Sequence, residues 1–491
     1  MFRPLFAKRR WITAALAACL ALMLVPTPAS AQASITFQPP GTFVFYISED
    51  GSTTVGYDNG FAYVEKNGNR TTLTMGGAFS FPAGVTANGS TVVGTEYDFS
   101  FTPHAWIWHE GDAEPTQLLP GVPSTAWSIT PDGAVITGQR LDPFSFDTHA
   151  FAIRNGVYGD LTFPAALSTV ILGVSHDGSL IVGEVYREDP VTYSLLDDAI
   201  VWHADNSAAL VPMPPNTHTS RAVHVSEDGS TVVGTRVTFS VIPPPPELAW
   251  IWRVGAPSVS VVDLGGGDTS VSWLTPDGSK VVGSGEIAEE VRRGWVWENG
   301  VTTILAQPAG FVNSGADGIS ADGYRIVGTA YGPAPMPNFP QEVVVWDGNK
   351  PPQLLKDMLA SYGVNVGSAQ LYATFGVSAD GMTIGGAFYN PDNPPESVYG
   401  TFIAFLPLPP EKQLADLIVD VQGLGLEHGI TNALLTKLNA AATALMNSDH
   451  AGAIAKLNDF INQVNAQSGK KIPTDVANEL IAAAQAIIVL L

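Results

Sequence analysis

The sequence predicts a mainly β fold, an eight-bladed β-propeller followed by a small α-helical bundle. Two observations carry this prediction: a turn motif that recurs eight times between residues 34 and 408, and a change to helical spacing after Pro409-Pro410. At 491 residues the chain is too long for one ordinary core, so a large repeat domain is expected. The many glycines (49) and prolines (37) suit short strands joined by turns.

The turn motif ends in Asp-Gly, once in Asn-Gly, and apolar residues flank each copy. Glycine takes the positive φ that a tight hairpin turn needs, and Asp or Asn hydrogen-bonds within its own turn. One such residue per unit, always at the same turn, predicts a structural role for these side chains. They are Asp50, Asn88, Asp132, Asp177, Asp228, Asp277, Asp322 and Asp380.

A third and a fourth strand are expected after each hairpin. The third is apolar and usually contains Trp or Phe, as in residues 105–108, 249–252 and 402–405. Four antiparallel strands make one propeller blade, and residues 34–408 divided among eight units give about 47 residues per blade. Seven blades are the alternative, if the short first unit is absorbed elsewhere.

The last unit ends at Phe405 and lacks a fourth strand of its own. Residues 34–37 resemble the fourth strand of another unit, at residues 160–163. We therefore predict that residues 34–37 complete the last blade and close the ring, which removes free sheet edges.

Residues 409–491 predict a small bundle of four helices, at about 411–423, 429–446, 448–468 and 473–490. Leu434, Leu438 and Leu445 fall on one helical face, and so do Leu457, Phe460 and Val464. Such stripes are typical of a bundle core rather than of a cofactor site.

Both regions resemble known families. The strand at 249–252, followed by Asp263-Leu264-Gly265 and the turn at Asp277-Gly278, resembles the HAF repeat of bacterial extracellular proteins. The Thr-Pro-Asp-Gly turns at 130–133 and 275–278 resemble those of TolB-type propellers. Residues 430–438, 460–465 and 480–485 resemble the FIMAH domain, a helical appendage of secreted bacterial proteins. These resemblances imply an architecture and an extracellular location, but no activity.

Residues 1–33 predict a secretory signal peptide. A positive region from Arg3 to Arg10 precedes an apolar stretch, Ile12 to Val25, and small-residue cleavage sites follow at 29–33. Cys19, the only cysteine, offers lipoprotein anchoring as a minor alternative. The apolar stretch is short for a membrane span, so we expect a secreted or cell-surface protein with no transmembrane segment in its mature chain.

The net charge of −23 makes nucleic acid an improbable partner, because like charges repel. Gly265-Gly266-Gly267 opens no expected helix, and the histidines show no metal-ligand spacing. We therefore expect no cofactor and no metal. The sequence does not fix the oligomeric state.

A ligand surface is predicted on one face of the propeller. The loops between the second and third strands are long, acidic, proline-broken and aromatic, and they share this face with the connections between blades. Exposed aromatic residues on a rigid scaffold suit the binding of a glycan or a peptide. The candidate ligand-binding residues are Tyr97, Phe99, Phe144, Phe146, Tyr186, Tyr193, Phe239, Tyr331, Tyr389 and Tyr399.

Three functions remain open at this point. The first is a secreted bacterial binding or scaffold protein whose variable loops bind glycan or an extracellular protein. The second is an extracellular polysaccharide-active enzyme, a lyase or glycoside hydrolase, with a carboxylate pair in the same face. The third is a structural matrix component. No catalytic residue can be chosen from the sequence.

Overall fold

The computed structural model describes residues 33–38, 41–48, 52–66, 68–142, 147–188, 195–238, 245–333, 340–392 and 399–491. Residues 35–404 form one compact unit, which is mainly β, and residues 405–491 belong to a second, helical unit. Residues 1–32, with the predicted signal peptide and Cys19, lie outside the described residues. None of the described helices is long and apolar enough to cross a membrane.

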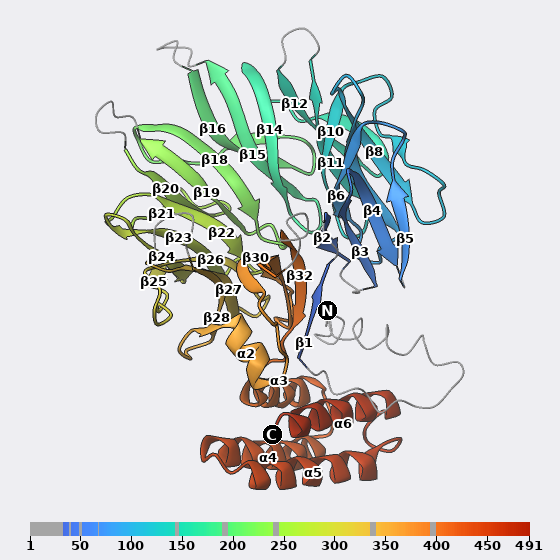
Figure 1. Cartoon of the computed structure of the whole chain (residues 1–491), viewed down its shortest axis with the longest axis vertical. Helices are drawn as coiled ribbons and strands as arrows, with labels where there is room; N and C mark the ends of the chain where they lie inside the picture. Colours follow the sequence, from blue (N-terminus) through green and yellow to red (C-terminus); the bar gives the residue numbers. More distant parts are fainter. Residues whose placement is uncertain are drawn as a thin grey trace. The chain divides into compact units, whose positions relative to one another are not determined.

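The first unit is a β-propeller of four-stranded blades that follow one another around a ring (Figure 1). Blade 1 consists of β2 (Thr42–Ile47), β3 (Thr53–Asp58), β4 (Phe61–Lys66) and β5 (Asn69–Leu73), and blade 2 of β6 (Phe79–Val85), β7 (Thr91–Tyr97), β8 (Pro103–His109) and β9 (Thr116–Gln117). Blade 3 consists of β10 (Ser124–Ile129), β11 (Val135–Leu141), β12 (Thr148–Arg154) and β13 (Val157–Asp160), and blade 4 of β14 (Ala166–Val174), β15 (Leu180–Glu188), β16 (Leu195–His203) and β17 (Ala208–Leu210).

Blades 5 to 8 continue the same order. Blade 5 consists of β18 (Thr217–Val225), β19 (Thr231–Thr238), β20 (Glu247–Arg253) and β21 (Ser260–Val262), and blade 6 of β22 (Thr269–Leu274), β23 (Lys280–Ala288), β24 (Val291–Glu298) and β25 (Val301–Ile304). Blade 7 consists of β26 (Asn313–Ile319), β27 (Arg325–Tyr331), β28 (Gln341–Asp347) and β29 (Gln353–Leu354). Blade 8 consists of β30 (Gln370–Val377), β31 (Thr383–Tyr389) and β32 (Tyr399–Phe405), completed by β1 (Ser34–Phe37). The short helix α2 (Leu355–Ser361) follows β29.

The ring closes as the sequence predicts. The last sheet has the order β1-β32-β31-β30, so the N-terminal strand supplies the fourth strand of blade 8. Among the described residues, six sheets have four strands, and one has eight because a single bridge between Asp197 and Thr219 joins blades 4 and 5. The mainly β propeller fold is thus confirmed, with eight blades.

The Asp-Gly turns are held by their own side chains. At Asp277, Oδ1 accepts the hydroxyl of Thr275 (2.7 Å) and the N–H of Ser279 (2.9 Å), while the Thr275 hydroxyl accepts the N–H of Lys280 (3.0 Å). The same Oδ1 contacts recur at Asn88, Asp132, Asp177, Asp228, Asp322 and Asp380. Asp50 lies outside the described residues.

Hydrogen bonds between blades also repeat. We call the Ser or Thr two residues before the Asp or Asn of each turn, such as Thr275, the turn hydroxyl. Six residues before it, another Ser or Thr accepts a backbone N–H from the third strand of the preceding blade, as Thr269 does from Ala249 (2.8 Å). Five more junctions, from blade 1/2 to blade 6/7, use the same contact, at Ser80, Ser124, Thr169, Ser220 and Ser314. At the junction of blades 8 and 1, the Thr401 hydroxyl instead donates to the carbonyl of Thr42 (3.1 Å).

The innermost strand of every blade carries an irregularity at one shared position, three residues before the turn hydroxyl. The register of pairing shifts there in all eight blades, as in a β-bulge. The bulged residues are Phe45, Ala83, Trp127, Leu172, Val223, Ser272, Asp317 and Phe375. Equivalent side chains of different blades therefore lie at one level of the propeller.

Adjacent blades pack through one pair of apolar positions. A glycine recurs in the second strand of every blade, as Gly234 does in blade 5. The residue before it, here Val233, is fully buried and packs with Leu274 on the innermost strand of the next blade. This position is a fully buried Val or Thr in blades 1 to 7 but Gly385 in blade 8. A Cβ placed on Gly385 would meet no atom within 4 Å, and its expected partner in blade 1, Ile47, is 43% exposed. Over the described residues, the seam between blades 8 and 1 is therefore less filled than the others.

The second unit is a bundle of four helices: α3 (Pro410–Gly423), α4 (His428–Met446), α5 (His450–Gln467) and α6 (Thr474–Val489). Asp449 caps α5 by accepting the N–H of Gly452 (2.8 Å). Leu434, Leu438, Leu457, Phe460 and Val464 lie in its core, as their helical spacing predicts.

Candidate functional site

An exposed loop between β7 and β8 presents two phenylalanine rings. Asp98 organises this loop, because its Oδ1 accepts the N–H of Ser100 (2.8 Å) and of Thr102 (2.9 Å). These backbone hydrogen bonds, that of Thr102 first, hold the pKa of Asp98 below its usual range. The loop fixes Phe101 at a φ of +63°, which is an unfavourable conformation for a bulky residue. Phe99 and Phe101 are 79% and 71% exposed.

A row of aromatic rings continues from this loop across blades 2 and 1. Phe101 lies 6.0 Å from Phe79, and Phe79 stacks on Tyr97 at 4.9 Å between ring centroids. Phe79 also contacts Phe81 (5.7 Å), which stacks almost parallel on Tyr57 at 4.9 Å and 5°. We call this set the aromatic row; it consists of Phe43, Tyr57, Phe79, Phe81, Tyr97 and Phe101.

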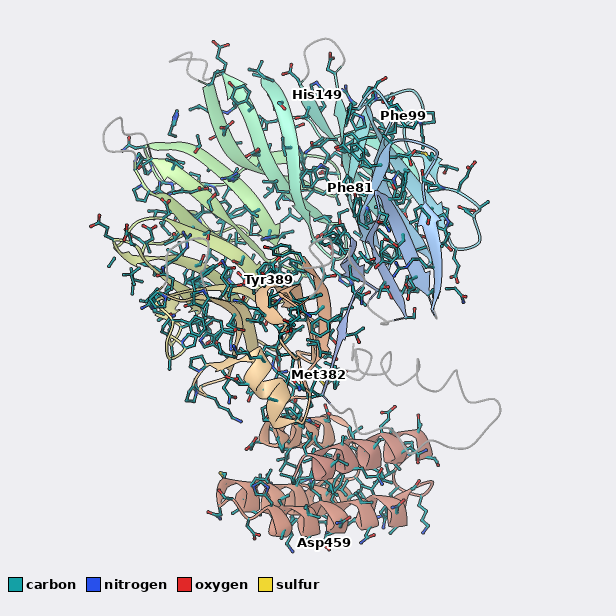
Figure 2. All side chains as sticks on the ribbon, viewed as in Figure 1. Phe81, Phe99, His149, Met382, Tyr389 and Asp459 are labelled. Atoms are coloured by element: carbon teal, nitrogen blue, oxygen red, sulfur yellow. The ribbon has the colours of Figure 1, made fainter. Side chains whose placement is uncertain are left out.

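The row combines rigid backbone with exposed apolar surface. Phe79 and Phe81 lie on β6, Tyr57 is the penultimate residue of β3, and Phe43 is the second residue of β2. The rings of Phe43 and Tyr57 lie 6.4 Å apart. Phe43 and Phe81 stay exposed although both belong to strands. Contiguous exposed apolar surface of this kind marks a surface for interaction. Figure 2 labels Phe81 and Phe99 on these N-terminal blades.

A second aromatic cluster lies on blade 8. Tyr399 is exposed, and its ring lies 5.1 Å from Tyr389 and 6.2 Å from Tyr372. Tyr389 ends β31 and Tyr399 begins β32, so the loop between these strands brings the two together. The position of Tyr389 in the last blade can be followed in Figure 2.

The remaining candidate residues are not gathered into either cluster. Tyr186 lies near the end of β15 and Tyr331 ends β27, where burial raises the pKa of its hydroxyl. Phe144, Phe146, Tyr193 and Phe239 lie outside the described residues. Of the ten predicted ligand residues, Tyr97 thus belongs to the aromatic row, Phe99 lies in its loop, and Tyr389 and Tyr399 belong to the blade 8 cluster.

Five members of the row are not among the ten predicted ligand residues: Phe43, Tyr57, Phe79, Phe81 and Phe101, the last of which lies in one of the predicted loops. Three of them alternate with other residues inside innermost strands, a pattern that reads as ordinary strand packing. A comparison of equivalent positions among the repeats does indicate two of these rings. Five residues before the turn hydroxyl, blades 1 and 2 carry Phe43 and Phe81, whereas blades 3 and 5 carry Thr125 and Arg221.

One carboxyl group stands apart by its environment. Burial raises the pKa of Asp317, the bulged residue of β26, to about 6, although the hydroxyl of Thr329 donates to its Oδ2 (2.9 Å). Burial also raises the pKa of Glu184 and Asp197 in blade 4. Within the described ranges, no three His, Cys, Asp or Glu side chains are grouped so that they could hold a metal ion.

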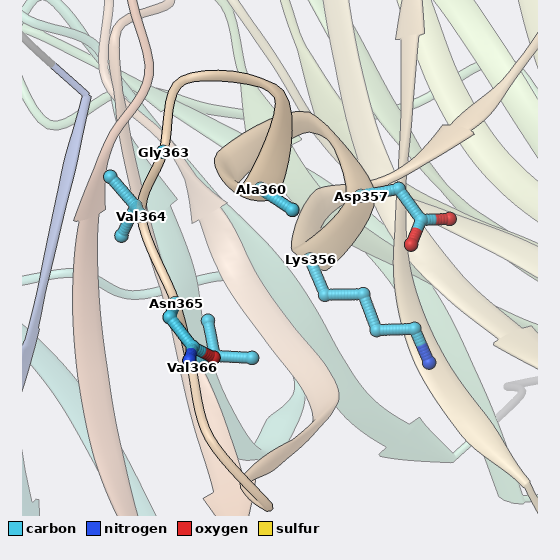
Figure 3. A pocket seen from close by; sticks show the side chains of 7 residues that line it. All are labelled: Lys356, Asp357, Ala360, Gly363, Val364, Asn365 and Val366. Atoms are coloured by element: carbon cyan, nitrogen blue, oxygen red, sulfur yellow. The ribbon is translucent and has the colours of Figure 1, made fainter.

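A shallow hollow beside α2, with a volume of about 310 Å³, offers a less suitable site (Figure 3). Lys356, Ala360, Val364 and Asn365 are among its lining residues, and none of the described residues that line it is aromatic. Lys356 forms an ion pair with Glu342. The hollow therefore lacks the stacking surface that the aromatic row provides.

Comparisons with known proteins found one family match and several similar solved structures. Residues 425–489 match the FIMAH domain. Solved propeller structures are similar to the chain: a putative TolB from Agrobacterium tumefaciens (15% identity, 46% of this chain and 80% of that one, TM-score 0.33), and the propeller domain of the Trilobed protease from Pyrococcus furiosus (13%, 65% and 96%, 0.39). The dipeptidyl peptidase 4 of Porphyromonas gingivalis is also similar (9%, 72% and 58%, 0.48). No protein of curated function matches the chain in sequence.

These comparisons concern fold rather than activity, because the identities are low and the family match covers the C-terminal region only. The strand order describes a β-propeller, and the family match identifies a FIMAH domain at residues 425–489 in the helical unit that follows.

Proposed function

We propose that this chain is an exported carbohydrate-binding protein whose propeller recognises neutral or amino-sugar glycans at the aromatic row. The observation that carries the proposal is the parallel stack of Tyr57 and Phe81, flanked by exposed Phe43 and Phe101. Flat aromatic faces on rigid strands match the apolar faces of sugar rings, and they lose little conformational entropy on binding.

The backbone of the β7–β8 loop supports a binding role. A phenylalanine with positive φ costs on the order of 1–3 kcal/mol, and such strain clusters at functional sites. Glycine would fit the conformation of residue 101 without strain, yet the position holds an exposed aromatic ring. The ring is therefore better explained by a ligand than by the stability of the loop.

Charge narrows the class of glycan. The chain has a net charge of −23, and Asp98 lies next to Tyr97 of the row in sequence, whereas Asp58, next to Tyr57, forms an ion pair with Arg70. A polyuronate or sulfated polymer would meet repulsion, whereas a neutral chain would not and an amino sugar would be attracted. Predicted export by residues 1–33 would place the protein where such polymers occur.

A glycan array tests this proposal. The protein without residues 1–33 is screened beside Phe81→Ala, and Tyr158→Ala serves as the matched control because Tyr158 is a similarly exposed ring outside the row. We expect neutral or amino-sugar hits that Phe81→Ala weakens by about tenfold and that the control keeps. Silence across the array, or equal binding by Phe81→Ala, would refute the assignment.

A polysaccharide-active enzyme is the second candidate, and Asp317 is the observation that favours it. A carboxyl group with a pKa of about 6 is suited to general acid catalysis near neutral pH. Incubating the protein with each glycan hit and measuring new reducing ends tests this candidate. Release that Asp317→Asn abolishes would establish an enzyme, and absence of release from every bound glycan would exclude it for those glycans.

A further inference from the structure

Beyond the aromatic row, a second set of rings faces the central channel of the propeller. The innermost strand of each blade borders this channel. Five large aromatic side chains occupy the bulged position or the next residue on these strands: Phe45, Tyr46, Trp127, Trp273 and Phe375. We call this set the aromatic belt.

Exposure distinguishes the belt from the core of the blades. The five side chains are between 38% and 59% exposed, whereas Trp106, Trp250 and Trp295 on third strands are completely buried. Because the bulge occurs at one register in every blade, the belt residues lie at one level although they come from blades 1, 3, 6 and 8. Bulges re-aim side chains, and here they leave large rings open to the channel.

The belt is continuous with the aromatic row along β2. Phe43 belongs to the row, Phe45 and Tyr46 belong to the belt, and Ile47 beyond them is also exposed. Because β2 bulges at Phe45, Phe43 and Tyr46 pair with Tyr57 and Val55, so the two positions lie two paired residues, about 7 Å, apart along the sheet. That spacing corresponds to a short stretch of a sugar chain rather than to one ring.

The partly filled seam between blades 8 and 1 widens access to the belt. Gly376 and Gly385 in blade 8 each have open space where a Cβ would stand, within the described part of the chain. In contrast, a Cβ on Gly318, the counterpart of Gly376 in blade 7, would lie 3.0 Å from the backbone of blade 8. Phe375 of blade 8 and Phe45, Tyr46 and Ile47 of β2 therefore stay exposed on the two sides of the seam.

The polar groups at this level also suit a sugar. Asp317 is the bulged residue of blade 7, and the ring of His224 lies 5.1 Å from Trp273. Burial lowers the pKa of His224 to about 4, so this ring is neutral at physiological pH. No Lys or Arg occupies the bulged position or the next residue in any blade.

We propose that the aromatic belt is a second carbohydrate subsite, which takes the continuation of a chain bound at the aromatic row. The ligand is then a linear glycan that runs from the row into the channel, rather than a single terminal sugar. This inference rests on the proposed carbohydrate binding at the row.

A chain-length series tests it. Calorimetric titration measures the affinities of disaccharides and octasaccharides of glucose, xylose, mannose and N-acetylglucosamine for the protein without residues 1–33. We expect the octasaccharide of the preferred sugar to bind about tenfold more tightly than its disaccharide. The double variant Trp127→Ala/Trp273→Ala should lose the tighter binding of the octasaccharide and keep the affinity for the disaccharide. Leu172→Ala is the matched control, because Leu172 occupies the bulged position of blade 4 without an aromatic ring, and it should keep the tighter binding.

The outcomes separate the two proposals. If no sugar of either length binds, carbohydrate binding itself fails and the belt subsite with it. If disaccharide and octasaccharide bind equally, or the double variant keeps the tighter binding of the octasaccharide, the belt is not a subsite, while carbohydrate binding at the aromatic row is not contradicted. Trp127→Phe/Trp273→Phe is the control for misfolding of the alanine variant. It retains aromatic rings at both positions and should therefore show the tighter binding of the octasaccharide.

Discussion

At the scale of single residues, the propeller places unfavourable features where the proposed ligand would bind. Phe101 has positive φ, Asp317 is a partly buried carboxyl group with a raised pKa, and the belt rings are exposed to solvent. Each costs free energy of folding, while the turns and the contacts between blades repeat almost without exception. Departures from such regularity are where function is expected.

Phe101→Gly should separate stability from binding. Glycine adopts positive φ without strain, so we expect the free energy of unfolding to stay constant or to rise by up to about 1 kcal/mol. The affinity for the glycan should fall, because an exposed ring of the row is lost. Urea unfolding and calorimetric titration measure the two quantities; a clear loss of stability, or unchanged affinity, would contradict this account of Phe101.

Asp317→Asn should change how stability depends on pH. The pKa of Asp317 in the folded protein, about 6, lies above its ordinary value of 3.8, so the folded state holds the proton more tightly than the unfolded state. Wild-type stability should therefore lose a contribution on the order of 2 kcal/mol as pH rises from about 4 to 6. In Asp317→Asn this loss is absent.

The difference between the two unfolding curves isolates this carboxyl group, since other titrating groups are common to both proteins. His224 acts in the opposite direction, because its lowered pKa removes stability as pH falls from its ordinary value toward 4. A difference curve that is flat between pH 4 and 6 would show that Asp317 is not shifted.

At the scale of strands and blades, the repeat in the sequence predicted most of the fold. Each Asp-Gly turn lies between two hairpin strands, and the prediction that residues 34–37 complete the last blade is confirmed. These features depend on local turn chemistry and on period, which the sequence displays directly. The aromatic row was only partly predicted, because Phe79, Phe81 and Tyr57 become neighbours through the packing of two blades, which no spacing within one strand reveals.

The seam between blades 8 and 1 yields a prediction at this scale. Gly385→Val supplies the side chain that blades 1, 2, 4, 5, 6 and 7 have, and its Cβ would meet no described atom within 4 Å. We expect the free energy of unfolding to rise by about 1–2 kcal/mol through added apolar burial and strand propensity.

Val233→Gly is the matched control at a filled seam. It removes a fully buried side chain that packs with Leu274 and should destabilise by about 2–4 kcal/mol. Chemical denaturation of both variants measures the two effects. A loss of stability in Gly385→Val would mean that the seam has no room for the side chain.

At the scale of the whole molecule, the two units have different relations to the proposed function. The aromatic row and belt belong to the propeller, whereas the helical unit, which contains the FIMAH match at residues 425–489, has a core made of its own residues. The helices were well predicted because apolar periodicity sets each helical face, and the match to residues 425–489 agrees with the resemblance in sequence.

Phe460→Ala tests this division of roles. Phe460 is completely buried in the helical core, so its truncation should destabilise the helical unit by about 3–5 kcal/mol. The affinity of the propeller for its glycan should not change. Circular dichroism of the helical signal and calorimetric titration measure the two effects, and weakened glycan binding would place part of the site in the helical unit.

The most direct test of carbohydrate binding at the aromatic row is a crystal structure of the protein with a neutral or amino-sugar oligosaccharide that binds in solution. The account predicts a sugar ring stacked on the surface formed by Tyr57 and Phe81, with the chain extending along β2 toward Phe45 and Tyr46. A sugar bound elsewhere, with the aromatic row empty at a concentration that saturates the protein in solution, would contradict it.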